Sequence, residues 1–399
     1  MNVANTLRHC PICADARAEV LYSQQLVAPD FYPSCESQDI ACCETCGFVY
    51  TDSALTQADF DAYYARHSRY VDGKTSSGSG EVAWDLARLE ETARCIAAQL
   101  QSKAARIFEI GCANGGLLIA LRRLGYENLM GLDPSPVCVQ NVRDTGIKAT
   151  QGLLSAIPAD IGQFDCVILC GVIEHVFDLR GAVKAVRPLV ADGGCLYLDV
   201  PDAERYAATS PFQDFNTEHI DHFSQAGLDN LMSLIGFETF AQGTKAPLAP
   251  PPWPYPAAYC FARLPSDGSI PKLKKDIRLK SKILEYIDRS KRLVQAIDAR
   301  LAAQLKLTPK IIVWGTGQLA MKLLADTVLR DAQIIAFVDG SSAAQGGMLR
   351  GLPILSPADI SKFAEPILIT SILHEKAIVD VIREQLRAPN PIITLVSHS

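Results

Sequence analysis

The sequence predicts an α/β protein whose largest part is a doubly wound, mostly parallel sheet. Strand patterns alternate with helix patterns from about residue 93 to residue 264, as in such sheets. A glycine-containing turn stands between a strand and a helix in FEIGCANGG (108–116) and again in IIVWGTGQLA (311–320). Two CxxC pairs precede both patterns. We therefore expect a cysteine-rich module (1–60), a main α/β domain (61–264), a helical linker (265–308) and a small α/β domain (309–399).

The composition is that of an ordinary globular protein, with 48% hydrophobic and 21% charged residues. A net charge of −6 argues against a partner that is nucleic acid or an acidic membrane surface. The first residues lack the apolar core of a signal peptide, and no stretch reaches the length of a membrane span. We therefore expect a cytoplasmic protein with reduced cysteines, acting as a monomer or homodimer on a small molecule.

The two CxxC pairs are Cys10 with Cys13 and Cys43 with Cys46. Four thiolates suit a tetrahedral Zn²⁺ ion, and four protein ligands leave no open position for a substrate. Cys42 competes with Cys43, but only Cys43 has the CxxC spacing. A set of reduced core cysteines is the alternative. We predict a structural zinc site made by Cys10, Cys13, Cys43 and Cys46.

Tyrosines cluster in DFDAYYARHSRY (59–70), and small polar residues follow them. Tyr63, Tyr64 and Tyr70 could pack a short helix. Alternatively, they could belong to a lid over a bound ligand. We take Tyr70 as a candidate substrate-binding residue.

An acidic residue stands at the end of each of two successive strands in the main domain, Glu109 and Asp133. Small residues after Glu109 would let the turn approach a bulky ligand, and Asp133 could accept hydrogen bonds from ribose hydroxyls. The pattern therefore predicts a nucleotide-like cofactor. The turn lacks G-x-G-x-x-G, which disfavours NAD in this domain.

Together with FDCVILCGVIEHV (164–176), these motifs resemble class I methyltransferases that use S-adenosylmethionine. The resemblance implies that the acidic-glycine turn holds the methionine part of the cofactor, that Asp133 holds the ribose, and that residues 152–154 line the adenine. Ala113 stands where the family usually has a glycine. An unrelated nucleotide-binding sheet is the alternative. The implied cofactor residues are Glu109, Gly111, Cys112, Ala113, Gly115, Asp133, Pro134, Leu153, Cys170, Gly171, Val172 and His175.

The densest polar segment is FNTEHIDHFS (215–224), which holds two of the seven histidines. Histidine suits proton transfer near neutral pH, and a neighbouring carboxylate can orient it. The segment also precedes an amphipathic helix that Ser224 could cap. Because no third ligand stands at a clear spacing, we predict a catalytic or substrate-binding role in preference to a metal site.

The order of all these parts resembles the three-domain sugar C-methyltransferases, which act on nucleotide-linked deoxysugars. The resemblance implies that His219 is the base beside a ketone and that Glu218 assists it. Asn216 and His222 are candidate donors to the enolate oxygen. The chain has Asn216-Thr217 and Asp221-His222 where the family usually has Tyr-His and Ser-Tyr. O- or N-methylation of a sugar or small metabolite is the alternative.

A proline-rich segment (247–256) precedes a predicted helix from residue 272 to residue 307. We expect this helix to pack between the domains through an apolar stripe at helical spacing. The stripe comprises Leu273, Ile277, Leu284, Ile287, Val294, Ile297, Leu301 and Leu305.

In the last domain, Gly315, Gly317 and Ala320 fit G-x-G-x-x-A, and Asp339 follows the next strand. A helix that begins after Gly317 could receive a phosphate. The family resemblance implies a Rossmann-like domain that helps to hold the sugar nucleotide. We rank a sugar-nucleotide phosphate first, a pure scaffold second and bound NAD third. His374, which follows another strand, joins Gly315 and Gly317 as a candidate substrate-binding residue.

Overall fold

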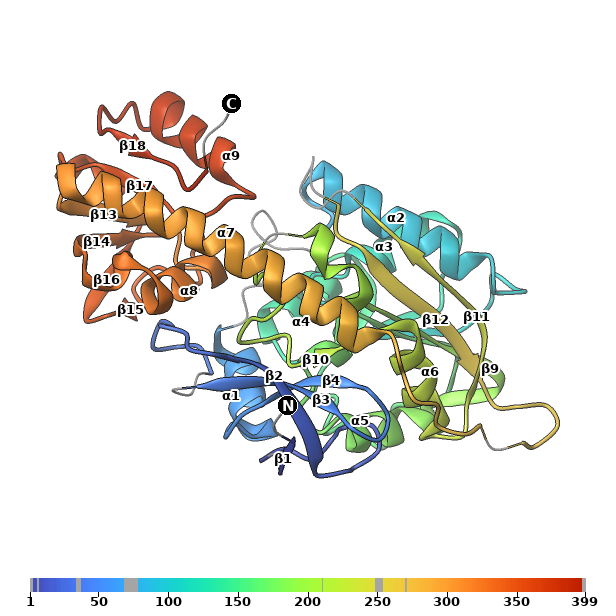
Figure 1. The fold of residues 1–399 in the computed structure, drawn as a ribbon. Helices are drawn as coiled ribbons and strands as arrows, with labels where there is room; N and C mark the ends of the chain where they lie inside the picture. The colour runs from blue at the N-terminus through green and yellow to red at the C-terminus, as the bar shows by residue number, and fades with distance from the viewer. Residues whose placement is uncertain are drawn as a thin grey trace.

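The computed structural model describes residues 3–5, 7–33, 37–67, 78–209, 211–247, 254–269 and 271–396. These residues form a mixed α/β fold with three sheets (Figure 1). None of the helices in these ranges is long and apolar enough to cross a lipid bilayer.

The first sheet is antiparallel, and its last strand comes from the middle of the chain. In its order β1-β2-β3-β4-β10, Asp221 lies opposite Tyr50 and His222 opposite Val49. The buried Arg8 guanidinium contacts both carboxylate oxygens of Asp221 at 3.0 Å, a bidentate arrangement. The N-terminal module thus fixes one end of the polar segment 215–224. The strands are β1 (Val3–Asn5), β2 (Arg17–Gln24), β3 (Gln38–Cys43), β4 (Val49–Asp52) and β10 (Asp221–His222).

The central sheet has the order β11-β12-β9-β8-β5-β6-β7. The five strands β9, β8, β5, β6 and β7 are parallel, and β12 is antiparallel to β9. The chain enters at β5 and continues on both sides of it, so the strand order reverses between β5 and β8. Ligands bind at the carboxyl ends of strands beside such a point. The strands are β5 (Ile107–Ile110), β6 (Leu129–Asp133), β7 (Lys148–Gln151), β8 (Phe164–Cys170), β9 (Val190–Pro201), β11 (Glu238–Lys245) and β12 (Ala257–Arg263).

Helices cover both faces of the central sheet. On one face pack α2 (Ala83–Ala97), α3 (Gly116–Arg123) and α4 (Pro136–Asp144). On the other face pack α5 (Leu179–Val186), α6 (Gln225–Ser233) and the cysteine-rich module. The Ser224 hydroxyl accepts a hydrogen bond from the Gly227 N–H at 3.0 Å, so the predicted cap of α6 is confirmed.

The third sheet has the order β15-β16-β14-β13-β17-β18, and its chain also enters at a central strand. All neighbours are parallel except β15 and β16. Helix α8 (Gln318–Asp326) follows β13 directly, as the glycine turn predicts, and α9 (Glu375–Asp380) follows β17. The strands are β13 (Lys310–Trp314), β14 (Gln333–Val338), β15 (Met348–Leu349), β16 (Leu352–Leu355), β17 (Ile367–Ile369) and β18 (Ile392–Ile393).

Helix α7 (Leu279–Leu307) runs from the third sheet to the other two (Figure 1). It begins later than predicted because the Asp276 carboxylate accepts hydrogen bonds from the N–H groups of Arg278 and Leu279 at 2.9 and 3.0 Å. The predicted stripe is therefore wrong in part: Leu273 and Ile277 precede the helix and are exposed, and Leu284 within the helix is exposed as well. The buried stripe starts at Leu279 and joins a core shared with the first and third sheets.

Candidate cofactor and acceptor site

A cavity of about 400 Å³ opens at the carboxyl ends of β5, β6, β8 and β9. Its lining also includes residues of α2 and of α1 (Gln57–His67), and Leu373 and His374 from the last part of the chain. The cavity therefore lies at the strand reversal of the central sheet and reaches the segment that follows β17.

The turn after β5 is shaped for close approach of a ligand. Gly111 has φ +75°, and a Cβ atom there would lie 2.5 Å from Val172 Cγ2. Ala113 has φ +44°, in the region that favours glycine, which accounts for the glycine of the resembled family at this position. The Asp133 carboxylate accepts hydrogen bonds from the N–H groups of Ala113 and Ser135 at 2.8 and 2.9 Å. This carboxylate therefore fixes the turn in addition to lining the cavity.

Burial controls the charge of both acidic residues at this turn. Burial raises the pKa of Asp133 to about 6, against the opposing effect of its two backbone hydrogen bonds. Burial also raises the pKa of Glu109 well above its ordinary value, and the nearby Arg88 charge opposes this rise. Among the described residues, no donor reaches Glu109 Oε2, although Glu109 is only 4% exposed. A buried carboxylate oxygen needs a donor, and the amino group of a methionine moiety fits this position.

The structure brings the predicted cofactor residues together, with one exception. Gly115 does not border the cavity. Its φ of +78° begins α3 instead, and a Cβ atom there would lie 2.9 Å from Val142 Cγ2. The residues that do border the cavity are Glu109, Gly111, Cys112, Ala113, Asp133, Pro134, Leu153, Cys170, Gly171, Val172 and His175.

Replacing Gly111 with alanine is expected to weaken S-adenosylmethionine binding by about tenfold or more, because the added methyl group displaces Val172 from the cavity wall. Gly146→Ala is the matched control, since Gly146 has φ +83° and open space around it. Both variants carry the strain of positive φ, about 1–2 kcal/mol. Calorimetry would measure cofactor binding, and equal affinities in the two variants would contradict the assignment of this turn.

His219 lies in a buried corner of the cavity with Glu174 and His175. The two imidazole rings meet edge to face at 4.8 Å between centroids, and His175 Nε2 lies 3.8 Å from Glu174 Oε1. His175 Nδ1 lies 3.0 Å from the Glu218 carbonyl oxygen and 2.9 Å from the Tyr64 hydroxyl. Burial raises the pKa of Glu174 to about 7. Glu174 and His175 belong to a 3-10 turn, η2 (Ile173–His175), that follows β8.

This corner changes one inference from the sequence, which found no third metal ligand near His219. Glu174, His175 and His219 each place a potential ligand atom within 4.8 Å of the other two. Glu174 and His175 are adjacent, but His219 lies more than 40 residues further along the chain, so the spacing carries no signal. The corner could move a proton or hold a divalent cation.

Of the four predicted catalytic residues, only His219 borders the cavity. The Tyr63 hydroxyl donates to the Glu218 carboxylate. The Asn216 side chain closes a turn, because its Oδ1 accepts from the N–H groups of Glu218 and His219 at 2.8 and 2.7 Å. His222 is fully buried, and burial lowers its pKa to about 3. The structure therefore corrects the assignment of Asn216 and His222 as enolate donors, since neither side chain reaches the cavity.

The predicted substrate-binding residues divide in the same way. His374 borders the cavity, and burial lowers its pKa. Gly315 and Gly317 do not border it. Their turn is fixed by Asp339, whose carboxylate accepts from the N–H groups of Thr316 and Ser341 at 2.8 and 2.9 Å, as Asp133 does in the main domain. Tyr70 lies outside the described residues.

Several charged residues that line the cavity were not predicted from the sequence, among them Arg88, Asp199 and Lys245. Lys245 forms an ion pair with Asp199 and donates to Thr92 Oγ1 at 2.6 Å. Asp199 stands near the carboxyl end of β9, and the rule for such strand ends could have found it. Arg88 and Lys245 carry no such signal. Arg88 belongs to α2, and Lys245 ends β11, the edge strand beside β12.

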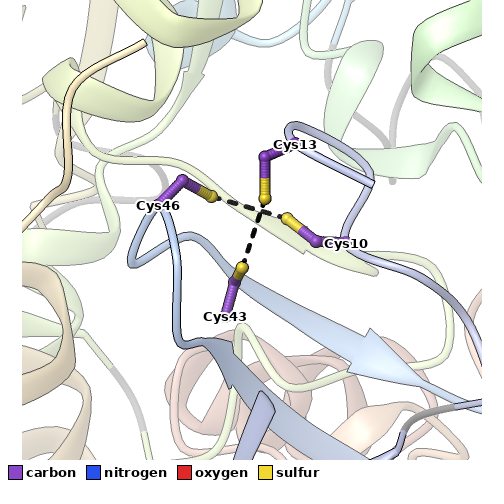
Figure 2. Close-up of side chains that lie close together, drawn as sticks. All are labelled: Cys10, Cys13, Cys43 and Cys46. Atoms are coloured by element: carbon purple, nitrogen blue, oxygen red, sulfur yellow. Dashed lines mark hydrogen bonds between the residues drawn. The ribbon is translucent and has the colours of Figure 1, made fainter. Parts of the chain in front are cut away.

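The four cysteines of the two CxxC pairs converge, as Figure 2 shows. Cys10 and Cys46 place their sulfurs 3.5 Å apart, and Cys13 and Cys43 place theirs 3.4 Å apart. Zinc–sulfur bonds of about 2.3 Å in a tetrahedron place sulfurs about 3.8 Å apart, so the cluster is compatible with zinc. These separations are too long for disulfides. The neighbouring Cys42 thiol contacts the Gly47 carbonyl at 3.7 Å and is not part of the cluster.

Two parts of the chain match models of known protein families. Residues 85–242 match the family model described as "Methyltransferase domain", and residues 307–390 match the model described as "C2185-like, N-terminal". A ubiquinone biosynthesis O-methyltransferase of Xanthomonas campestris pv. campestris (strain B100) is 29% identical over 158 residues, which are 37% of this chain and 62% of that protein. The homologous enzyme of Xanthomonas axonopodis pv. citri (strain 306) is 28% identical over 110 residues, 26% of this chain and 46% of that protein.

The chain spans about half the length of these curated relatives. Among solved structures, magnesium protoporphyrin IX methyltransferase from Synechocystis PCC 6803 is 13% identical with a TM-score of 0.37, covering 54% of this chain and 90% of that one. The [4+2]-cyclase SpnF is 13% identical with a TM-score of 0.43, covering 53% and 97%. The match of residues 85–242 to the family model confirms the prediction that this chain contains a methyltransferase domain.

Proposed function

We propose that the protein transfers a methyl group from S-adenosylmethionine to a nucleotide-linked keto sugar, at a carbon beside the ketone. The observation that carries this proposal is the extent of the cavity. It joins the cofactor turn to His219 and to His374, which the last part of the chain supplies. A sugar nucleotide is a long ligand, and a site formed by two parts of the chain suits it.

His219 is the proposed base. It would take the proton of the C–H bond beside the ketone, and the electron pair of that bond would form an enolate. Bound S-adenosylmethionine would supply the sulfonium methyl group that the enolate carbon accepts. The imidazolium would then return its proton to water. General base catalysis of this kind contributes about 10²–10⁴-fold to a rate, and the fixed turn after β5 supports the alignment that methyl transfer needs.

The nucleotide part would be held by the third sheet, whose strand order supports a Rossmann-like domain. Gly317 precedes α8, and the position of a Cβ atom there has nothing within 4 Å, so a phosphate could approach the helix amino terminus. Gln318, the first residue of α8, donates to the Phe215 carbonyl at 3.2 Å. This hydrogen bond places the start of α8 beside the segment that carries His219.

A screen of nucleotide-linked keto sugars with a methyl-labelled donor would test the proposal by mass spectrometry. The expected product is a sugar nucleotide that carries one labelled methyl group. The proposal fails if the protein binds S-adenosylmethionine but labels none of these acceptors.

A second candidate is methyl transfer to a hydroxyl group of a sugar or small metabolite, with His219 deprotonating that hydroxyl. The curated relatives favour it, since they are named as O-methyltransferases. Deuterium uptake separates the candidates. In heavy water with S-adenosylhomocysteine, exchange at the acceptor carbon supports C-methylation, whereas methyl transfer without such exchange supports O-methylation.

We also propose that Cys10, Cys13, Cys43 and Cys46 bind one structural zinc ion. The proposal rests on the convergence of four thiols whose spacing is compatible with a tetrahedral site.

A further inference from the structure

A second carboxylate, that of Asp214, lies behind His219. Asp214 Oδ1 is 3.8 Å from His219 Nδ1 in a fully buried position. Among the described residues, no hydrogen-bond partner reaches His219 Nδ1. A buried ring nitrogen needs a partner, and closing this gap by about 1 Å would make the hydrogen bond. Hydrogen bonds at catalytic sites are often long before the substrate binds.

The surroundings of Asp214 hold its carboxylate in a defined orientation. The Tyr255 hydroxyl donates to Oδ1 at 2.9 Å, and the Thr209 hydroxyl donates to Oδ2 at 3.0 Å. The Asp214 backbone N–H donates to the Tyr286 hydroxyl at 3.2 Å. Tyr255 also borders the cavity, whereas Asp214 does not. Asp214 would therefore act through His219 and not on the substrate.

Glu218 is the carboxylate that the sequence favoured for this role, but its contacts point elsewhere. Tyr63 donates to its side chain, and its backbone carbonyl lies against His175. No ion pair joins Glu218 to His219 in the described part of the chain, whereas Asp214 lies at 3.8 Å.

We propose that Asp214 is the positioning residue that orients His219, holding Nδ1–H so that Nε2 faces the acceptor and stabilising the imidazolium that forms. This inference rests on the proposed role of His219 as the base. When the C–H bond of the acceptor breaks, its proton passes to Nε2, and the resulting positive charge lies beside the Asp214 carboxylate. The arrangement serves C- and O-methylation equally.

The test follows the imidazole of His219 by NMR in the full chain labelled at histidine, with His219→Gln identifying the signal. In the described part of the chain, the titratable groups near this ring are Asp214 from the loop before it, Glu174 and His175 from η2, and His222 from β10. Asp214→Asn keeps the shape and removes only the charge. Because a nearby carboxylate favours the imidazolium, this variant is expected to lower the titration midpoint of His219.

Asp202→Asn is the matched control, since Asp202 is also a buried carboxylate but accepts a hydrogen bond from the Glu204 N–H and does not border the cavity. It is expected to leave the midpoint unchanged. In turnover, Asp214→Asn is expected to lower kcat by about 10–100-fold with little change in KM, and to move the acid limb of the kcat profile to lower pH.

An unchanged midpoint in Asp214→Asn would overturn this inference, whatever the acceptor proves to be. A lowered midpoint in a protein that methylates no nucleotide keto sugar would support it and overturn the proposed function instead. If Asp214→Asn does not fold, Tyr255→Phe replaces it. Loss of the Tyr255 hydroxyl removes a competing donor from Oδ1, so the midpoint should rise, and an unchanged midpoint would again overturn the inference.

Discussion

Replacing His219 with glutamine is expected to lower the rate of methyl transfer by about 10²–10⁴-fold and to leave S-adenosylmethionine binding intact. Glutamine preserves polarity and approximate size but cannot take a proton at neutral pH. His219 is also the one predicted catalytic residue that borders the cavity, and the cofactor turn is built by other elements. Single-turnover kinetics would measure the chemical step, and calorimetry would measure cofactor binding.

His222→Gln is the comparison variant, because His222 lies three positions further along but faces the core. It is expected to lower the thermal stability while the folded fraction keeps its turnover rate. Near-normal turnover in His219→Gln would rule out the base assignment.

The cofactor side of the site could be predicted from the sequence because its geometry is local. Glu109 and Asp133 each stand at the end of a strand, and parallel neighbouring strands bring such ends together. The turn between β5 and α3 needs small residues at positions that the sequence displays directly. Hence most of the predicted cofactor residues border one cavity.

The acceptor side could not be predicted in the same way, because segment 215–224 has little regular structure of its own. The direction in which each of its side chains points depends on contacts with residues far away in the sequence. Pairing of β10 with β4 turns His222 into the core, and the Tyr63 hydroxyl donates a hydrogen bond to the Glu218 carboxylate. Asp214 carries no motif, and only the fold places it behind His219. The polar composition of the segment therefore indicated chemistry there but not which residue performs it.

Cys43→Ser is expected to release the proposed zinc ion and to destabilise the protein by about 3–5 kcal/mol, since loss of a metal is among the few single changes with so large an effect. Structural zinc contributes about 10–16 kcal/mol of apparent binding free energy in zinc-finger peptides, and folding shares that energy. Elemental analysis would measure the metal content, and the midpoint of urea unfolding would measure the stability. Cys42→Ser is the matched control, since Cys42 is a buried thiol beside the cluster but outside it. Equal zinc content in the two variants would contradict the proposed site.

The same variant is expected to lower kcat more than it lowers cofactor affinity. Strand β4 begins shortly after Cys46 and pairs with β10, and the Thr51 N–H donates to the Ile220 carbonyl at 2.8 Å. A zinc site that fixes the start of β4 would therefore also fix the residue next to His219. The cofactor turn is held by β5, β6 and α3 and does not depend on that pairing. If Cys43→Ser lost cofactor affinity and kcat in equal proportion, the module would support the whole fold and not the catalytic segment in particular.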